Sequence, residues 1–545
     1  MKRLLVLAIL LPVFLFAEFV NFSGSVNIYA EYDAINGDTL QESTSELRFN
    51  LNPTLTIYGM PLEFDLFLTS IESDLRQALN KYRIFLQPEK LLREMVHLPG
   101  FVFSISGVEI GTCYPYYSPF SLTGIPVTGG AVEVNPGPIY LAATAGRVQR
   151  GVVGSDTTDA AYERMLYAGR LGIGGKDDSH ILFTFLYSGD DTTSIPPYTF
   201  PVASDSDTVE VITPQENYVV GIDLKLSLFN DNFSVESEIA ASQLTDDIRM
   251  PEVVIQDIPQ WLSGIINPRI SSSYDYAYSV KSNLYLFNTG IYGLVNMIGP
   301  GFSSFGTSNL RNDNLTYEFG LDKSLLDNNI IFSASNRREH DNLIGSKTST
   351  TFFSSYNFNV GLNFSNLPYL QVAYTPYRES NDSLDIDRRT DILSLGTGYN
   401  FTMFNLDNSM SFYYSRQSYR ETSDSNNYAS NSFSINNSIN FNFPLNISAG
   451  FGITNTDYAD REERIISFDM GASYTSFERW TNTIGFNISS EGEKGSRNGI
   501  YFNSSLSMGW FGYMNFNAER NFYSGEYEEE DYDEWRIIGS VSKSW

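Results

Sequence analysis

The sequence of 545 residues holds a single cysteine, Cys113. One thiol gives neither a disulfide framework nor a thiolate metal site. Long apolar runs are also missing after the N-terminus, where no stretch approaches the roughly 18 uninterrupted apolar residues of a membrane-spanning helix. These absences exclude a disulfide scaffold, a cysteine metal centre and a helical membrane protein.

Histidine is almost as scarce, with three in the chain. His97, His180 and His340 fall in different expected connections, and none has the i, i+4 spacing with a glutamate that a zinc enzyme uses. His340 stands beside Asp341 in a polar connection, where a solvated side chain is the expected state. No serine, histidine and acid residues are arranged as a nucleophilic site requires. We therefore expect no enzyme activity, no catalytic residues and no cofactor.

Positive charge is also limited, because 35 Lys and Arg stand against 64 Asp and Glu, for a net charge of −29. Nucleic-acid binding requires clustered Lys and Arg, so that function class is excluded. Charged residues make up only 18% of the chain, whereas aromatic residues make up 14%, with 39 Phe and 35 Tyr. A soluble protein would have to bury these rings in a core, but a membrane barrel can place them against lipid and at both interfaces.

The N-terminus has the features of a signal peptide over residues 1–17. Lys2 and Arg3 precede an apolar run over residues 4–16, and Ala17 is the expected residue before the cleavage site. The run contains Pro12 and is short for a membrane span. No cysteine follows it, so a lipoprotein anchor is not expected. The chain is therefore predicted to be exported.

Strict alternation of apolar and polar residues dominates the remaining sequence. Residues 356–364 (YNFNVGLNF) put large apolar side chains on one face and asparagine or glycine on the other. Residues 466–474 (ISFDMGASY) and the first mature segment from Val20 repeat the pattern. A polar face of Asn, Ser, Thr and Gly opposite a face of Phe, Tyr, Leu and Ile is typical of a strand between lipid and a wet lumen.

Short connections and long polar connections take turns along the chain. The short ones lie near residues 59, 136, 176, 230, 289, 327, 366, 406, 444, 477 and 511, with a further link at 88–100. Short periplasmic turns opposite long outer loops are typical of outer-membrane barrels. We predict an all-β fold in which residues 18–545 form one large antiparallel transmembrane β-barrel of about 26 strands, with a range of about 22 to 28.

Some segments do not fit the strand pattern. Residues 91–96, within an insert near 88–98, are predicted to form a short helix that lies beneath the barrel or folds inward as a partial plug. Residues 113–126 (CYPYYSPFSLTGIP) are predicted to be an outer loop, and residues 299–313 a further loop. The two longest irregular segments, 190–215 and 245–272, are the predicted loops that cap or constrict the lumen.

The C-terminus carries the most specific motif. The last strand, EWRIIGSVSKSW, ends on an aromatic residue and has an outward-facing series at alternate positions, formed by Trp535, Ile537, Gly539, Val541 and Trp545. It resembles the β-signal of Gram-negative outer-membrane barrels, although Lys543 stands where an apolar residue is commoner. The resemblance implies insertion by the barrel-assembly machinery and an outer-membrane location. At about 3.3 Å per residue and a tilt near 40°, Trp535 and Trp545 would sit in the two aromatic girdles.

Parity along the strands predicts which charges face the lumen. In the N-terminal half these are Glu46, Arg48, Glu63, Asp65, Arg83, Asp223 and Lys225. Such a charged wall could line a constriction and bias ion or solute passage. Alternatively, opposite charges on adjacent strands simply pair and hold the wall together.

The acidic run at 526–534 (EYEEEDYDE) is predicted to be a solvated outer loop. The alternative is a Ca²⁺ or basic-partner site, because carboxylate oxygens suit Ca²⁺. The run lacks the ordered spacing of a known calcium loop.

Three functions remain open after these exclusions. Strand alternation begins directly after the signal peptide, which leaves no room for a plug domain or periplasmic repeats before the barrel. The favoured function is a porin-like channel in the lipid bilayer that passes small polar solutes or ions passively. The alternatives are a partner-dependent export or scaffold barrel and a surface adhesin that displays the long loops. The sequence does not indicate an oligomeric state.

Overall fold

The computed structural model describes residues 19–37, 41–71, 76–154, 158–195, 212–253, 267–382, 386–422, 426–526 and 530–545. The predicted signal peptide, residues 1–17, lies outside these ranges, as do the middles of the two long segments 190–215 and 245–272. Within the described ranges, no helix is long and apolar enough to cross a membrane.

The described residues form one sheet of 26 strands. In chain order the strands are β1 (Val20–Gly37), β2 (Gln41–Ile57), β3 (Met60–Thr69), β4 (Lys81–Leu86), β5 (Ile105–Cys113), β6 (Val127–Val134), β7 (Ile139–Gln149), β8 (Glu163–Ile173), β9 (His180–Asp191), β10 (Glu216–Leu228), β11 (Phe233–Thr245), β12 (Ser272–Leu286), β13 (Thr289–Ile298), β14 (Asn314–Leu325), β15 (Ile330–His340), β16 (Thr351–Leu362), β17 (Tyr369–Asn381), β18 (Ile386–Met403), β19 (Leu406–Glu421), β20 (Tyr428–Asn440), β21 (Leu445–Tyr458), β22 (Glu462–Ser476), β23 (Trp480–Ser490), β24 (Gly495–Ser507), β25 (Tyr513–Gly525) and β26 (Tyr532–Ser544).

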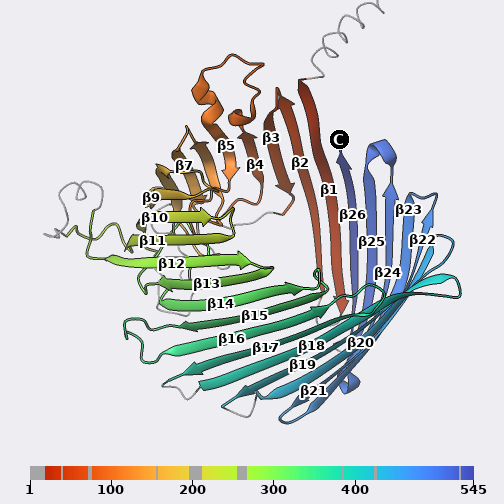
Figure 1. Ribbon diagram of the computed structural model, residues 1–545. Helices are drawn as coiled ribbons and strands as arrows, with labels where there is room; N and C mark the ends of the chain where they lie inside the picture. Colours follow the sequence, from red (N-terminus) through yellow and green to blue (C-terminus); the bar gives the residue numbers. More distant parts are fainter. Residues whose placement is uncertain are drawn as a thin grey trace, which may run out of the picture.

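Each strand pairs antiparallel with its neighbours in sequence, and β26 pairs with β1. The last pairing runs from Ser25 opposite Ser544 to Gly37 opposite Tyr532 and closes the sheet into a barrel (Figure 1). A closed barrel has no free strand edge, which is what a sheet needs in order to span lipid. The predicted single large barrel is confirmed, and so is its strand number.

The short connections between strands gather at one end of the barrel, at the twelve places predicted. Several are two-residue turns in which both residues have positive φ, such as Phe287–Asn288 at 50° and 55° and Phe404–Asn405 at 55° and 60°. This conformation matches the twist of the flanking strands and therefore makes tight hairpins. The rings of Phe287 and Phe404 are more than 80% exposed at the tips.

The two faces of the wall differ as the alternation predicts. Large apolar side chains such as Phe22, Phe319, Phe358 and Phe486 are exposed on the outward face. The alternate residues on the other face are mainly polar or charged, and many are joined by hydrogen bonds across strands. The wall therefore has an apolar exterior for lipid and a polar interior.

The helix predicted for residues 91–96 is wrong. That segment contains a turn, and it is flanked by two short 3-10 helices, η1 (Pro88–Lys90) and η2 (Gly100–Ser104). The Leu92 N–H donates to the Tyr58 carbonyl at 2.9 Å, which ties the segment to the turn between β2 and β3 and competes with a helical hydrogen bond. The insert extends past the rim at the end with the short turns (Figure 1), so it does not plug the lumen.

Candidate functional site

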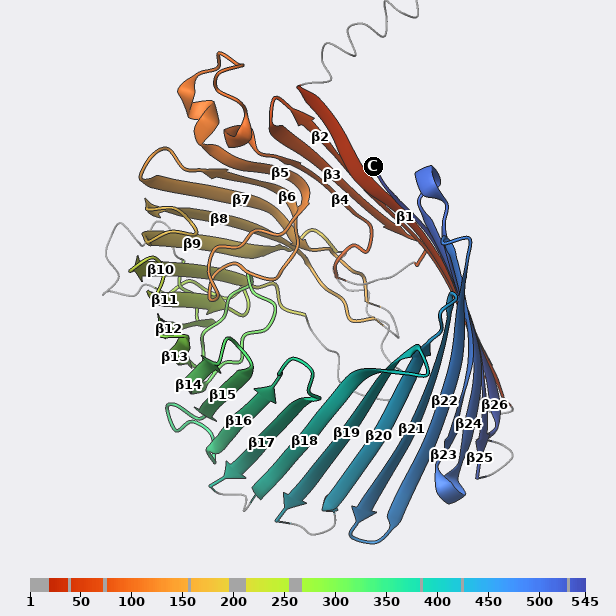
Figure 2. The same ribbon diagram turned by 45° about the vertical axis from the view of Figure 1, so that its right-hand side comes forward.

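Two loops at the long-loop end fold back inside the ring of strands. The first comprises residues 114–126 and joins β5 to β6, and the second comprises residues 299–313 and joins β13 to β14. Figure 2 shows both within the barrel, next to the inner face of the strands from β7 to β13. The expectation that residues 113–126 form an outer loop is therefore wrong.

A buried apolar cluster holds the two loops against the wall. The loops contribute Tyr117, Phe120, Leu122, Ile125 and Phe302, whereas the wall contributes Leu166, Ala168, Leu186, Val219, Ala240, Ala277 and Ile298. The rings of Phe120 and Phe302 meet edge to face with centroids 5.9 Å apart. Each fully buried side chain of this size contributes about 1.5–3 kcal/mol, so the loops are packed parts of the fold.

Backbone hydrogen bonds join the loops to one another. The Thr123 N–H donates to the Gly306 carbonyl at 2.8 Å, and Thr123 and Thr307 form a parallel bridge. The Ser304 hydroxyl donates to the Ser121 carbonyl at 2.7 Å. Because each loop satisfies polar groups of the other inside the barrel, the two form one structural unit, which we call the double loop.

The side chain of Asn217 on β10 fixes the double loop to the wall. It is fully buried, its amide N–H groups donate to the Gln243 and Ser303 carbonyls at 3.0 and 2.9 Å, and its oxygen accepts from the Phe305 N–H at 3.0 Å. On β8, the Arg164 guanidinium lies 3.6 Å from the centre of the Phe305 ring. These contacts fix the position of the 299–313 loop across the inner face.

A second anchor holds the 114–126 loop. The Phe120 N–H donates at 3.2 Å to the carboxylate of Glu238, which is only 4% exposed on the inner face of β11. The Tyr117 hydroxyl lies 3.0 Å from that of Thr144 on β7. Burial raises the pKa of Tyr117 to about 12, so this loop phenol stays neutral and keeps its hydrogen bond throughout the physiological range.

Gly306 is the point of closest approach within the double loop. A Cβ atom there would lie 2.1 Å from the Ser121 carbonyl oxygen and 2.6 Å from Leu186 Cδ1. We expect Gly306→Leu to force the loops apart, to lower the unfolding free energy by about 1–3 kcal/mol and to increase open-channel current noise. Thermal unfolding and single-channel recordings in planar bilayers measure the two effects. Gly100→Leu is the matched control, since nothing lies within 4 Å of a Cβ at that position.

Five of the predicted lumen charges belong to two groups on the inner face of β2–β5. Guanidinium nitrogens of Arg83 lie 2.6 Å from a carboxylate oxygen of Asp65, 3.9 Å from one of Glu63 and 3.8 Å from one of Glu109. We call these four residues the Arg83 cluster. Glu46 and Arg48 pair with each other on β2, away from this cluster. Three carboxylates around one guanidinium leave the Arg83 cluster with net negative charge.

Asp223 and Lys225 belong to a separate group on β8–β11. The Asp223 carboxylate accepts one hydrogen bond from Arg170 and lies 3.1 Å from His180 Nε2. The Lys225 ammonium lies 3.7 Å from a carboxylate oxygen of Glu236. These residues line a cavity of about 420 Å³ next to the 114–126 loop, together with Tyr116, Tyr117, Pro119, Lys176, Asp177, Ser237, Glu238, Ser279, Lys281 and Leu294. The predicted charges therefore do not form a single wall.

Sequence reasoning missed several residues of these groups. His180 is the first residue of β9 and is buried, so its assignment to a connection is wrong. The strict alternation of residues 233–239 (FSVESEI) indicates that Glu236 and Glu238 share the lumen face, and it could have identified both. The contacts agree with opposite charges that pair across strands, whereas the effect of the charges on ion passage stays a prediction.

The last strand carries the predicted assembly residues on one face. Trp535, Ile537, Gly539 and Val541 lie at alternate positions of β26 on its outward face. Trp545 follows the strand, exchanges two backbone hydrogen bonds of 3.0 Å with Gly24 and stacks on Phe22 at 5.6 Å between centroids.

Lys543 stands where an apolar residue is commoner, and its ammonium lies 4.1 Å from the centre of the Trp510 ring at the rim. This contact gives the lysine an aromatic partner in place of an apolar one. The role of the strand as an assembly signal stays a prediction.

The described part of the chain contains no group of three or more His, Cys, Asp or Glu side chains that could hold a metal ion. In the acidic run at 526–534, Asp533 pairs with Arg520 at 2.7 Å and Glu534 with Arg497 at 3.0 Å. Residues 527–529 lie outside the described ranges, so the calcium alternative stays untested.

No protein-family model and no curated protein sequence matches the chain. Among solved structures, the P pilus usher (PapC) translocation pore is similar over 95% of this chain and 99% of that chain, with 10% identity and a TM-score of 0.30. OccK2 (OpdF) of Pseudomonas aeruginosa is similar over 96% and 98%, with 9% identity and a TM-score of 0.30. OccAB4 of Acinetobacter baumannii is similar over 63% and 94%, with 10% identity and a TM-score of 0.30. These likenesses are of barrel architecture alone.

Proposed function

We propose that the chain is an outer-membrane channel that passes small polar solutes and ions without energy input and prefers cations. The observation that carries this proposal is the double loop, which lies inside the barrel and is fixed to its wall by packing and by the side chains of Asn217 and Glu238. A barrel of 26 strands encloses a lumen wider than small solutes require, since barrel diameter grows with strand number. A packed inward loop narrows such a lumen.

The lining supports passage of polar species. The inner face of the strands from β16 to β25 is rich in Asn, Ser and Thr, which hydrogen-bond to one another across strands, as in the pairs Ser432–Thr454 and Ser473–Thr483. Neutral hydroxyl and amide groups exchange hydrogen bonds with passing water and solutes at little energetic cost. The net negative Arg83 cluster on the opposite arc supports the preference for cations.

Reconstitution of the mature protein in planar bilayers tests the proposal. In a KCl gradient we expect steady current steps and a reversal potential that indicates K⁺ preferred over Cl⁻. Heat-modifiable gel migration establishes that the reconstituted protein is folded. Folded protein that gives no current would refute passive conduction and favour a barrel that works with a partner.

A further inference from the structure

An unusual group of arginines lies on the outward face of the barrel at the long-loop end of β17–β19. Arg378 on β17, Arg389 on β18, and Arg416 and Arg420 on β19 are all exposed, and we call them the arginine patch. Because side chains alternate between the two faces of a strand, these arginines lie on the same face as the lipid-facing residues of their strands, such as Leu393 and Met410. The patch concentrates positive charge on a chain whose net charge is −29.

Only part of this positive charge is neutralised by carboxylates. Arg378 makes a two-pronged pair with Asp387 at 2.9 and 2.6 Å, and Arg389 pairs with Asp391 at 2.9 Å. No carboxylate in the described part of the chain forms an ion pair with Arg416 or Arg420. Two carboxylates against four guanidinium groups leave a local excess of positive charge.

The register adds an unfavourable contact between like charges, which a bound anion would relieve. Arg389 and Arg420 are directly opposite each other in the antiparallel pair of β18 and β19. Like charges in this position destabilise a sheet. An anion with several oxygens placed between the two guanidinium groups would turn this repulsion into charge-assisted hydrogen bonds.

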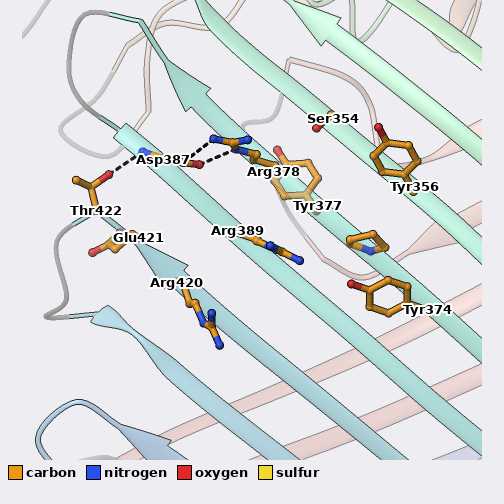
Figure 3. Close-up of a pocket in the computed structure, with 11 residues that line it drawn as sticks. Ser354, Tyr356, Tyr374, Tyr377, Arg378, Asp387, Arg389, Arg420, Glu421 and Thr422 are labelled. Carbon is orange, nitrogen blue, oxygen red and sulfur yellow. Dashed lines mark hydrogen bonds and ion pairs between the residues drawn. The ribbon is translucent and has the colours of Figure 1, made fainter.

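Three of the four arginines, Arg378, Arg389 and Arg420, border a groove in the outer surface. Figure 3 shows Arg389 and Arg420 side by side on neighbouring strands, with Tyr374 beside Arg389 and Tyr356 further along the groove. The groove has a volume of about 840 Å³ and is lined by these residues together with Ser354, Pro376, Tyr377, Arg378, Asp387, Glu421 and Thr422. Of these, Glu421 is paired with Arg388. The groove thus combines cations, hydroxyl groups and a ring surface, as a headgroup with an attached acyl chain requires.

The height of the patch fits the headgroup layer. On β18 the outward residues from Met403 to Leu393 are mostly apolar, and these ten residues rise about 25 Å at about 3.3 Å per residue and a tilt near 40°. That rise equals the apolar band of an outer-membrane barrel. Arg389 lies four residues further, or about 10 Å beyond the band by the same geometry, and arginine side chains extend toward phosphates at that level.

We propose that the arginine patch binds the phosphate groups of an outer-leaflet lipid headgroup, with the acyl chains along the apolar outward face of β17–β19. This site is separate from the lumen, so it is independent of the proposed channel function. Guanidinium groups are suited to phosphate because their donors match its oxygens in a two-pronged geometry.

Native mass spectrometry of the detergent-solubilised mature protein tests the proposal, with bisphosphorylated lipid A and its dephosphorylated form as probes. The wild type is expected to bind the phosphorylated lipid about tenfold more tightly, which is the effect of one or two charge-assisted hydrogen bonds. The double variant Arg389→Gln and Arg420→Gln is expected to lose this preference. The single variant Arg416→Gln, expected to weaken it, serves if the double variant fails to fold.

The matched control replaces two arginines on the inner face, Arg337→Gln and Arg388→Gln. Arg388 precedes Arg389 in sequence but pairs on the inner face with Glu379 and Glu421. The control variant should keep the full preference for the phosphorylated lipid. Equal binding of both lipids by the wild type, the same loss in the control, or displacement of the lipid by equimolar inorganic phosphate would each overturn the proposal.

Discussion

Removal of the double loop is expected to raise the single-channel conductance severalfold. The change replaces residues 115–125 and 300–312 by short Gly-Ser links, which leaves the strands and their pairing in place. Conductance follows the narrowest cross-section of a water-filled pore, and the double loop lies across the inner face of β7–β13. Recordings in planar bilayers before and after the change measure the effect.

The same deletion should lower the thermal stability of the barrel. It exposes the buried wall residues Leu166, Leu186 and Val219 and removes the rings of Phe120 and Phe302. A matched control shortens the loop Gly492–Lys494 between β23 and β24, which takes no part in the buried cluster. Unchanged conductance in the folded deletion variant would mean that solutes do not pass the double loop, and it would move the constriction to another part of the lumen.

The architecture could be predicted almost completely because it depends on local signals. Turn sequences such as FNTG and NLDN mark hairpins, and the observed turns Phe287–Asn288 and Phe404–Asn405 have the left-handed conformation that an asparagine adopts readily. Alternation then fixes which residues face lipid, since a shift of one residue would turn every phenylalanine into the lumen. Strand number follows from the sum of such turns, without any knowledge of distant contacts.

The inward folding of the two loops could not be predicted in this way. Phe120 and Phe302 are 182 positions apart in sequence and meet only because the closed wall brings β5–β6 opposite β13–β14. One local sign was nevertheless available. Residues 181–187 (ILFTFLY) are apolar on both faces, and a strand with Leu182 and Leu186 on its lumen side needs a covering segment.

The ion pairs of the lumen lining could not be predicted from the sequence for the same reason, because their partners come from different strands. The alternation of residues along each strand predicts that Asp65 and Arg83 share the lumen face. Only the strand register places their charged groups 2.6 Å apart and adds Glu109 from β5. Register likewise brings Arg170, from a strand two positions away, to Asp223. Single-strand patterns therefore predict the sign and side of a charge, whereas its partner follows from the folded sheet.

Neutralising two acids of the Arg83 cluster is expected to abolish the preference for cations. Glu63→Gln and Asp65→Asn together leave Arg83 with Glu109 alone, so the cluster changes from net negative to neutral. A unit charge about 4 Å away in water changes the energy of an ion by about 1 kcal/mol, which corresponds to about a fivefold change in the K⁺/Cl⁻ permeability ratio. Reversal potentials in a KCl gradient measure that ratio.

The opposite substitution separates an electrostatic effect from a structural one. Arg83→Gln removes the single cation among three carboxylates, so the permeability ratio should rise, whereas damage to the wall would shift both variants in the same direction. The outward-facing pair Asp387→Asn and Asp391→Asn is the matched control, because both acids also pair with arginines but face away from the lumen. If the ratio stays constant in both lumen variants, ions do not pass close to the Arg83 cluster, and the cavity beside Asp223 and Lys225 becomes the next candidate for the selective region.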